Sequence, residues 1–221
     1  AAATSSYRTA RNGAERAERF ARAAGMPVRV LSGDEEAMML AAGVLAEWNG
    51  DDEAAVLDIG GGSAEIVRAR AGEPWQAVSL PLGAIRLCED HNPPPDDEPC
   101  DPAALESMRR TIDRALEGVL PLAPGSVCFG SGGGFSTLGQ MAAGAGDGRN
   151  LAISLARIEA LAGQLSGMSA MQCARRFGIP PRRARIMPAG AWTAVAALRR
   201  LGSDSVTISW AGLREALALE A

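Results

Sequence analysis

The sequence contains no lysine: all 22 basic residues among its 221 positions are arginines. A P-loop needs a lysine that reaches the phosphates of a bound nucleotide, and a Schiff base forms on a lysine amine. The absence of lysine therefore excludes P-loop nucleotide hydrolysis and imine-forming catalysis as functions of this chain.

Histidine and cysteine are nearly as scarce. The single histidine, His91, excludes a zinc site built from several histidines. It precedes a proline-rich loop, and we expect a solvated loop residue there rather than a member of a Ser-His-Asp triad. The four cysteines lack CxxC spacing, which indicates reduced thiols and makes a zinc site or a disulfide framework unexpected: Cys88, Cys100, Cys128 and Cys173.

Long apolar runs and an excess of positive charge are also missing. No apolar run reaches the roughly 18 residues of a membrane span, and Arg8 and Arg11 are inconsistent with a secretory signal. The formal net charge is −4, so we expect neither a membrane nor nucleic acid as a partner. The remaining composition, 47% hydrophobic and 22% charged, is ordinary for a globular protein. Together with the reduced thiols, it predicts a cytoplasmic protein.

Helical and strand-like segments alternate along the chain. Residues 54–82 are interpreted as three consecutive strands of an antiparallel meander, preceded by a linker or turn at Asp51 to Glu53. A helix opens at Ser32 and continues to about Glu47, with the capping signal of a Ser followed by Glu. The other expected helices cover 10–25, 83–90, 102–120, 154–167, 182–201 and 212–220, the other strands 26–32, 125–130 and 204–209, and an exposed loop 92–102.

The stretch AVLDIGGGSAEIV, residues 55–67, places three glycines after an aspartate at the end of an apolar run. A dinucleotide-binding turn needs a third glycine at a later position and a following helix, whereas β-branched Ile66 and Val67 favour a strand. A strand, glycine turn, strand arrangement remains. Glycine permits positive φ angles and removes side chains, so the backbone N–H groups of the turn can hold an anion. Asp58 can then hold a metal ion, directly or through water; the alternative is a plain hairpin turn with an incidental aspartate.

A second glycine-rich turn, GSGGG at 130–134, precedes a predicted helix. It could bind phosphate at the N-terminus of that helix. It could equally serve only to let the helix pack closely on the sheet. The residues by themselves favour neither use.

Six segments occur in the order and spacing of one known family: ATSSYRTARNG, PVRVLSGDEEAMMLAAGVL, LDIGGGSAEIV, VSLPLGAIRL, GSGGGFSTL and TISWAGLREAL. Together they resemble the exopolyphosphatase and guanosine pentaphosphate phosphohydrolase (Ppx/GppA) family of the actin, Hsp70 and sugar-kinase superfamily. The resemblance covers nearly the whole chain and is most specific from Ala3 to Val67. It implies an α/β, actin-like (ribonuclease H-like) fold with two lobes and a mixed sheet flanked by helices. Residues 1–50 would be the remnant of a truncated first lobe, and residues 51–221 the second lobe.

The resemblance also implies a role for each matching residue. Glu36, in SGDEEA, would be the catalytic base that activates the attacking water, and Glu35 a capping or solvent-exposed neighbour. The structural alternative for Glu36 is a carboxylate that only stabilises the positive end of a helix. Asp58 would help to bind Mg²⁺, the implied cofactor. Arg8 would lie beside the phosphate chain of the substrate.

The remaining implied contacts are to phosphate. The first glycine turn would supply backbone groups from Gly60, Gly61, Gly62 and Ser63, and the possible second turn would supply them from Gly130, Gly132 and Gly133. Thr4, Ser5 and Asn12 belong to the same motif as Arg8.

The function implied by the resemblance is the release of terminal phosphate from inorganic polyphosphate or guanosine pentaphosphate. Cleavage of a phosphoanhydride needs neutralisation of charge on phosphoryl oxygens and an aligned water. Mg²⁺ on Asp58, the glycine amides and the guanidinium of Arg8 would supply the first, and Glu36 the second. A homodimer is expected from the resemblance. Two alternatives stay open: a non-catalytic module that binds polyphosphate or (p)ppGpp, and an ATP-dependent kinase of the same superfamily.

The chain departs from the family pattern in two regions. The first phosphate loop of the family, of the type IDIGSNS, is absent from the 57 residues before Asp58, so we expect this chain alone to be inactive or weak. Gly134 and Phe135 stand where the family has Thr and a small residue. Arg185 and Trp210 stand where an aspartate is common. These later departures bear on nucleotide contacts more than on phosphate hydrolysis.

Overall fold

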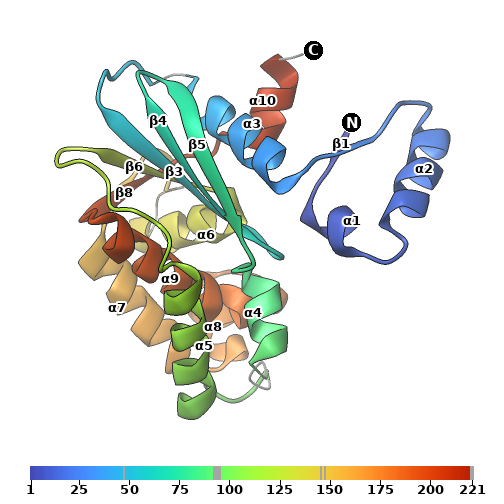
Figure 1. Cartoon of the computed structure of the whole chain (residues 1–221). Coiled ribbons are helices and arrows are strands. Elements are labelled where there is room, and N and C mark those ends of the chain that lie inside the picture. The colour runs from blue at the N-terminus through green and yellow to red at the C-terminus, as the bar shows by residue number, and fades with distance from the viewer. Residues whose placement is uncertain (47, 92–95, 145, 147, 220–221) are drawn as a thin grey trace.

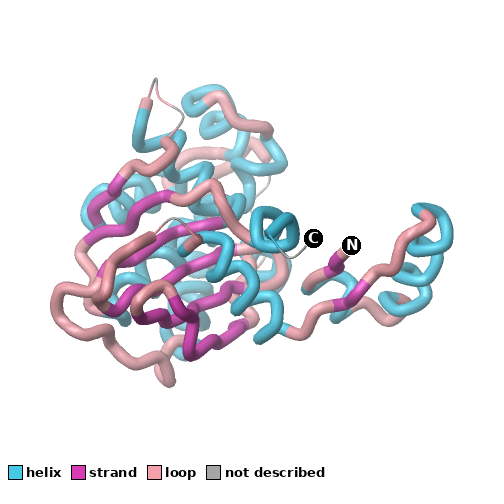
Figure 2. The backbone as a smooth tube through the Cα atoms, turned by 90° about the horizontal axis from the view of Figure 1, so that it is seen from above, coloured by secondary structure: helices cyan, strands magenta, loops and turns pink. Residues whose placement is uncertain are grey.

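The computed structural model describes residues 1–46, 48–91, 96–144, 146 and 148–219. In Figure 1 the chain forms a body around a sheet and a small N-terminal unit, residues 1–32, that projects from its side. Figure 2 shows the same projection from above. The predicted end of the second helix at Glu47, the start of the proline-rich loop at 92–95 and the last predicted helical residue, Glu220, lie outside the described residues.

The N-terminal unit contains two short parallel strands and two helices: β1 (Ala2–Ala3), α1 (Ser5–Thr9), α2 (Gly13–Ala24) and β2 (Arg29–Val30). Helix α2 begins later than predicted because Asn12 occupies its N-cap position, and it ends at Gly25 with a left-handed φ of 65°. The strand predicted over 26–32 is reduced to two residues, since its partner β1 is equally short.

Helix α3 (Gly33–Leu45) joins this unit to the body. Ser32 and Glu35 form a capping box, in which Glu35 N–H donates to Ser32 Oγ at 3.1 Å and Ser32 N–H donates to the Glu35 carboxylate at 2.8 Å. The predicted helix start and the capping role of Glu35 are confirmed. The next residue, Glu36, also lies in the first turn of α3 but takes no part in this capping box.

The body is built on a mixed six-stranded sheet of order β5-β4-β3-β6-β8-β7. Its strands are β3 (Glu53–Ile59), β4 (Ala64–Arg70), β5 (Glu73–Leu80), β6 (Val127–Ser131), β7 (Ala152–Ser154) and β8 (Ser205–Ile208). β3, β4 and β5 form the predicted antiparallel meander, whereas β3, β6 and β8 run parallel. This mixed sheet with helices on both faces confirms the predicted α/β class.

Helices cover the two faces of the sheet in unequal numbers (Figure 1). α3 and α10 (Leu213–Leu219) pack on one face. The other face forms the larger core, which takes side chains from α4 (Ala84–Asp90), α5 (Pro102–Ala115), α6 (Gly132–Ala143), α7 (Leu155–Ser166), α8 (Ala170–Phe177) and α9 (Pro181–Leu201). No helix in the described ranges is long and apolar enough to cross a membrane.

The side chains of β3 alternate between the two cores. Ala54 and Val56 pack with α3, whereas Leu57 and Ile59 pack with the larger core. The strand is therefore apolar on both faces, as its sequence predicts. By the same alternation, the side chain of Asp58 lies on the α3 face and that of Glu53 lies on the opposite face.

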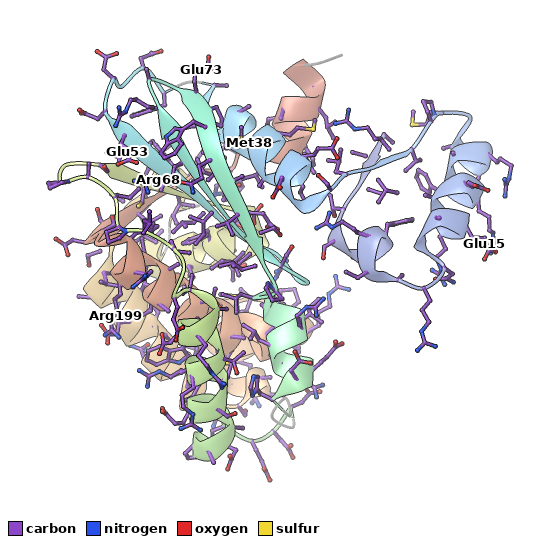
Figure 3. All side chains as sticks on the ribbon, in the orientation of Figure 1. Glu15, Met38, Glu53, Arg68, Glu73 and Arg199 are labelled. Atoms are coloured by element: carbon purple, nitrogen blue, oxygen red, sulfur yellow. The ribbon has the colours of Figure 1, made fainter. Side chains whose placement is uncertain are left out.

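The prediction for Glu53 was wrong. Residues 51–53 were expected to form a linker or turn, but Glu53 is the first residue of β3 and is buried. Its carboxylate accepts hydrogen bonds from Arg68 Nε at 2.8 Å and from Ala123 N–H at 2.9 Å. Figure 3 shows Glu53 and Arg68 close together on neighbouring strands. Because these partners are distant in sequence, a local pattern of charged residues could not reveal that the carboxylate is buried.

Candidate functional site

The C-terminal end of β3 gathers carboxylates from two strands and one helix. Asp58 lies directly opposite Glu65 in the β3–β4 ladder, so both side chains occupy the face that α3 covers. Glu36, in the first turn of α3, is close enough for its charge to act on both of them. The structure thus brings together the predicted metal ligand, the predicted base and a third carboxylate.

The carboxyl groups of Asp58 and Glu65 both have raised pKa values. Burial, assisted by the negative charges of Glu65 and Glu36, raises the pKa of Asp58 to about 7. Burial also raises the pKa of Glu65, although the hydroxyl groups of Ser63 and Ser79 oppose that rise. Ser79 Oγ donates to Glu65 Oε1 at 2.8 Å. Ionisation of both Asp58 and Glu65 is therefore unfavourable unless a cation lies beside them. Raised pKa values of this kind are typical of a functional site.

The oxygen donors at this end of β3 fit a hard divalent cation. The described residues include no set of three or more His, Cys, Asp or Glu side chains that could hold a metal ion by themselves. Mg²⁺ commonly uses one or two carboxylates and completes its shell with waters and substrate phosphates. Asp58 with Glu65 beside it fits a site of that kind. Sequence analysis missed Glu65, because which residue of β4 lies opposite Asp58 depends on the register of the β3–β4 ladder.

Arg8 connects the N-terminal unit to this cluster. Its Nη1 donates to Glu36 Oε2 at 2.9 Å and to the Leu31 carbonyl at 2.7 Å. The two side chains are 25% and 13% exposed, so the ion pair is half-buried. Arg8 therefore lies beside the carboxylates and fixes the orientation of Glu36. Asn12, from the same sequence motif, is exposed at the start of α2.

The first glycine turn, Gly60–Ser63, connects β3 to β4. None of its glycines has a positive φ, so of the two properties of glycine named in the sequence analysis this turn uses the missing side chain and not the freedom of φ. Glycine is needed here because side chains of other elements come close to the backbone of the turn. A Cβ at Gly62 would lie 2.6 Å from Ser5 Oγ, and a Cβ at Gly61 would lie 2.9 Å from Ile85 Cδ1. Ser5 thus places the N-terminal unit directly against the turn.

Helix α4 holds the carbonyl groups of this turn. Three donors bind three successive carbonyls at 2.9–3.0 Å: Ala84 N–H to Gly60, Ile85 N–H to Gly61 and Arg86 Nε to Gly62. Within the described ranges, the N–H groups of residues 61–63 have no acceptor. They remain available to an anion, as a phosphate-binding turn requires. Sequence analysis missed Arg86, which had no signal beyond its place in the VSLPLGAIRL segment.

The second glycine turn differs from its prediction. Strand β6 ends at Ser131 and α6 begins at Gly132, so the second glycine turn is the first turn of α6 and not a separate loop. Gly132 has a φ of +78°, and a Cβ there would lie only 1.9 Å from Asp58 Oδ1. A Cβ at Gly134 would lie 3.1 Å from the Ile59 carbonyl, which shows close packing of the helix on the sheet. Phosphate binding by Gly130, Gly132 and Gly133 stays a prediction.

Arg183 lies over this second turn. A Cβ at Gly133 would be 2.9 Å from both Nη1 and Nη2 of Arg183, which comes from the first turn of α9. A guanidinium beside the N-terminus of α6 brings two positive charges together. No local pattern predicts this contact, because Arg183 is 50 positions from Gly133.

Two residues that depart from the expected pattern have partners of their own. Arg185 Nη1 pairs with Asp96 Oδ1 at 3.6 Å. Trp210 lines a groove with Trp48 and Phe129 on the α10 side of the sheet, and the Arg149 guanidinium lies 5.0 Å from the centre of its ring. These interactions do not involve the glycine turns.

Comparison with solved structures shows the same fold. The chain is similar to a Ppx/GppA phosphatase from Aquifex aeolicus, type II variant (TM-score 0.82, 23% identity), to an exopolyphosphatase-like protein (0.88, 23%) and to an exopolyphosphatase from Cytophaga hutchinsonii (0.85, 21%). Each match covers 99% of this chain and, respectively, 73%, 76% and 72% of the other chain. These likenesses confirm the expected fold.

Membership of a family rests on a separate comparison. The model of the Ppx/GppA phosphatase family matches residues 1–221, the whole of the sequence. The motifs of the sequence analysis and the arrangement of Asp58 beside two glycine turns agree with that match. The chain belongs to the Ppx/GppA phosphatase family.

Proposed function

We propose that this chain forms much of the active site of a Mg²⁺-dependent phosphohydrolase that releases terminal phosphate from inorganic polyphosphate or guanosine pentaphosphate. The observation that carries the proposal is the meeting of Asp58, Glu65 and Glu36 at the end of β3, beside two glycine turns. Membership of a phosphatase family supports hydrolysis in general. The substrate and the residue roles are the proposal.

Asp58 would hold the metal ion, with Glu65 next to it. Bound Mg²⁺ would stabilise negative charge on the phosphoryl oxygens in the transition state. The raised pKa of Asp58 supports this role, because a buried carboxylate among other carboxylates gains most from a nearby cation. Since the ligand must be deprotonated, metal affinity should weaken as the pH falls below about 7, the pKa of Asp58.

Glu36 would accept the proton of the attacking water. Arg8 occupies one carboxylate oxygen, Oε2. The other oxygen, Oε1, accepts no hydrogen bond from the described residues and is free to orient a water molecule. Efficient general base catalysis needs a positioned carboxylate of this kind.

Phosphate groups would be bound by backbone and arginine donors together. The amides of the first turn face no acceptor within the described residues, and Arg86 and Arg183 each place a guanidinium at one of the two turns. Neither arginine has an acidic partner in the described part of the chain. Guanidinium groups suit phosphate because their planar fork binds two oxygens at once.

The test is phosphate release by the full-length gene product, measured with Mg²⁺ on both substrates. Glu36→Gln should lower the release rate by roughly 100-fold or more while polyphosphate binding remains, as expected for loss of a general base. Glu35→Gln is the matched control, because Glu35 is adjacent but only caps α3.

Three outcomes would contradict parts of the proposal. Unchanged turnover in Glu36→Gln would remove Glu36 from the mechanism. An equal loss in Glu35→Gln would indicate damage to α3 rather than loss of a base. If neither substrate releases phosphate with Mg²⁺ although polyphosphate still binds, the chain would belong to a non-catalytic binding module.

A further inference from the structure

Three side chains form a row across the end of the sheet, on the face that α3 covers. Asp58 of β3 lies opposite Glu65 of β4, and Glu65 lies opposite Ser79 of β5. Residues directly opposite each other in an antiparallel ladder project from the same face of the sheet. Ser79 is therefore next to the proposed site, although it belongs to neither glycine turn and has no part in the chemistry proposed for Glu36 and Asp58.

Ser79 holds the carboxylate of Glu65. Its Oγ donates to Glu65 Oε1 at 2.8 Å, and Glu65 is only 3% exposed. A buried carboxylate depends on protein donors to fix its orientation, because little water reaches it. The other hydroxyl that acts on Glu65 belongs to Ser63, in the first glycine turn. Ser79 is thus the donor to Glu65 that lies outside the proposed phosphate-binding residues.

The same serine lies against the start of the helix that carries Glu36. A Cβ added at Gly33, the first residue of α3, would lie 2.9 Å from Ser79 Cβ and 3.2 Å from Ser79 Oγ. Gly33 does not have a positive φ, so its backbone would accept alanine. The close approach of Ser79 is what requires glycine. This contact sets how near the first turn of α3 comes to β5 and hence to Glu65.

The two contacts of Ser79 come from different atoms. An alanine at position 79 would still meet Gly33 through its Cβ, so packing against α3 does not require a hydroxyl. The hydroxyl adds the hydrogen bond to Glu65. Substitutions can therefore remove the hydrogen bond and the contact with α3 separately.

We infer that Ser79 is a positioning residue that couples the two halves of the site. Its hydroxyl orients Glu65 beside the proposed metal position at Asp58. Its contact with Gly33 fixes how far Glu36 lies from that position. This inference rests on the proposed function, because it assumes that metal binding and water activation take place at these carboxylates. Ser79 acts only through Glu65 and α3.

The first measurement is metal binding to the full-length gene product, with Mn²⁺ as a spectroscopic probe in place of Mg²⁺. Electron paramagnetic resonance of free Mn²⁺ gives a Kd that does not depend on turnover. In Ser79→Ala this Kd should rise about 10-fold, as is common when a group that orients a carboxylate at a metal site is lost. The KM for substrate at saturating Mg²⁺ should change less than about twofold, because the glycine turns are intact.

The matched control is Ser126→Ala, which removes a hydroxyl beside the other buried carboxylate of β3. Ser126 Oγ lies 3.4 Å from Glu53 Oε2, on the opposite face of the sheet from the proposed site. Its loss should leave the Kd for Mn²⁺ unchanged. An equal rise of the Kd in this control, or an unchanged Kd in Ser79→Ala, would overturn the orienting role of the Ser79 hydroxyl.

The second measurement tests the contact with α3. Gly33→Ala should lower kcat at saturating Mg²⁺ about 10-fold, because the new Cβ meets Ser79 Cβ and moves the helix that carries Glu36. The Kd for Mn²⁺ should change less than about twofold, because the Ser79 hydroxyl remains. The double variant Gly33→Ala/Ser79→Gly transfers the Cβ from one residue to the other. Its kcat should recover, while its Mn²⁺ binding should be as weak as in Ser79→Ala. A kcat that stays low in the double variant would overturn the spacing role.

Metal binding and turnover are measured separately, so the two proposals can fail separately. If Mn²⁺ binding weakens in Ser79→Ala but the protein hydrolyses no phosphoanhydride, the orienting role stands and the proposed function fails. If Glu36→Gln abolishes hydrolysis while Ser79→Ala and Gly33→Ala change neither kcat nor the Kd for Mn²⁺, the proposed function stands and the positioning role fails.

Discussion

Strand β3 begins at one carboxylate, Glu53, and carries another, Asp58, at its next-to-last position and on the opposite face of the sheet. Glu53 accepts hydrogen bonds from Arg68 and from the Ala123 N–H, whereas Asp58 meets the carboxylates of Glu65 and Glu36. At the first end the buried carboxylate has hydrogen-bond donors. At the second end three carboxylates come together, and among the described residues only Glu36 forms an ion pair, with Arg8.

The pKa values of the two groups move in opposite directions. Burial tends to raise the pKa of Glu53, but the hydrogen bonds from Ala123 and Arg68 outweigh it and lower the pKa. Burial raises the pKa of Asp58 to about 7, and the nearby carboxylates add to the rise. We infer that Glu53 stabilises the fold, whereas Asp58 is retained at a cost in stability because the site needs it.

The largest effect on stability should follow from removing Glu53, the carboxylate that has hydrogen-bond donors. Glu53→Ala leaves the Arg68 guanidinium, which is 15% exposed, without its carboxylate, and the free energy of unfolding should fall by about 3–5 kcal/mol. Urea unfolding would measure this loss. Activity per folded molecule should stay the same, because Glu53 faces away from the proposed site.

The double variant Glu53→Ala/Arg68→Met supplies the control. It removes both charges, so it should recover part of the stability lost in the single variant. Equal stability of the single and double variants would show that Arg68 does not depend on Glu53.

The second prediction concerns Asp58, the carboxylate that lies beside other carboxylates. Asp58→Asn should lower kcat/KM by roughly 100-fold or more and should weaken the Mg²⁺ dependence of turnover, because a ligand of the metal is lost. Stability without metal should not fall, since a neutral amide relieves repulsion with Glu65. A Mg²⁺ titration with the same midpoint as the parent would contradict the proposed role of Asp58.

The same variant tests the pH dependence of stability. Between pH 3.8, the ordinary pKa of an aspartate, and about 7, folded Asp58 keeps a proton that the unfolded chain has lost. The free energy of unfolding should therefore fall as the pH rises through this range, and level off above about 7. Urea midpoints with a chelator should show a shallower fall in Asp58→Asn. Glu65, whose pKa is also raised, should leave a remaining slope.

Glu53 should give the opposite pH dependence. Its pKa is lowered on folding, so its contribution to stability is complete above 4.5, the ordinary value, and is lost as the pH falls through the lowered value. In Glu53→Ala this acid-side loss should be smaller than in the parent. If stability falls at low pH by the same amount in Glu53→Ala and in the parent, other carboxylates dominate the pH dependence in that range.

The difference between the two ends also shows what the sequence could reveal. Asp58 could be predicted because it adjoins a contiguous glycine motif, and Glu36 because it lies in a recognisable segment. The three meander strands and the helix that opens at Ser32 followed from local periodicity and capping. These features depend on neighbours within a few positions.

Glu53, Glu65, Arg86 and Arg183 needed the structure. Glu53 was interpreted as part of a turn because its partner Arg68 lies on the next strand. Glu65 becomes visible only when the register puts it opposite Asp58. Arg183 reaches Gly133 from a distant helix. Such contacts are set by tertiary packing, which overrides local preference and leaves no periodic signal in the chain.

The smallest effects concern the two glycines that shape the Asp58 end, and they separate two reasons for glycine. In Gly132→Ala, an L-residue must adopt a φ of +78°, which costs about 1–2 kcal/mol, and its Cβ would displace Asp58 Oδ1. In Gly61→Ala the backbone is unstrained and the Cβ meets only the flexible end of Ile85, so the cost should stay below about 0.5 kcal/mol. Thermal unfolding of both variants should therefore show a lower Tm in Gly132→Ala alone.

Phosphate release should also fall in Gly132→Ala, because the displaced carboxylate is the proposed metal ligand. Equal Tm values would mean that β6 and α6 relax around the new side chain, and that Asp58 is not held in place by Gly132.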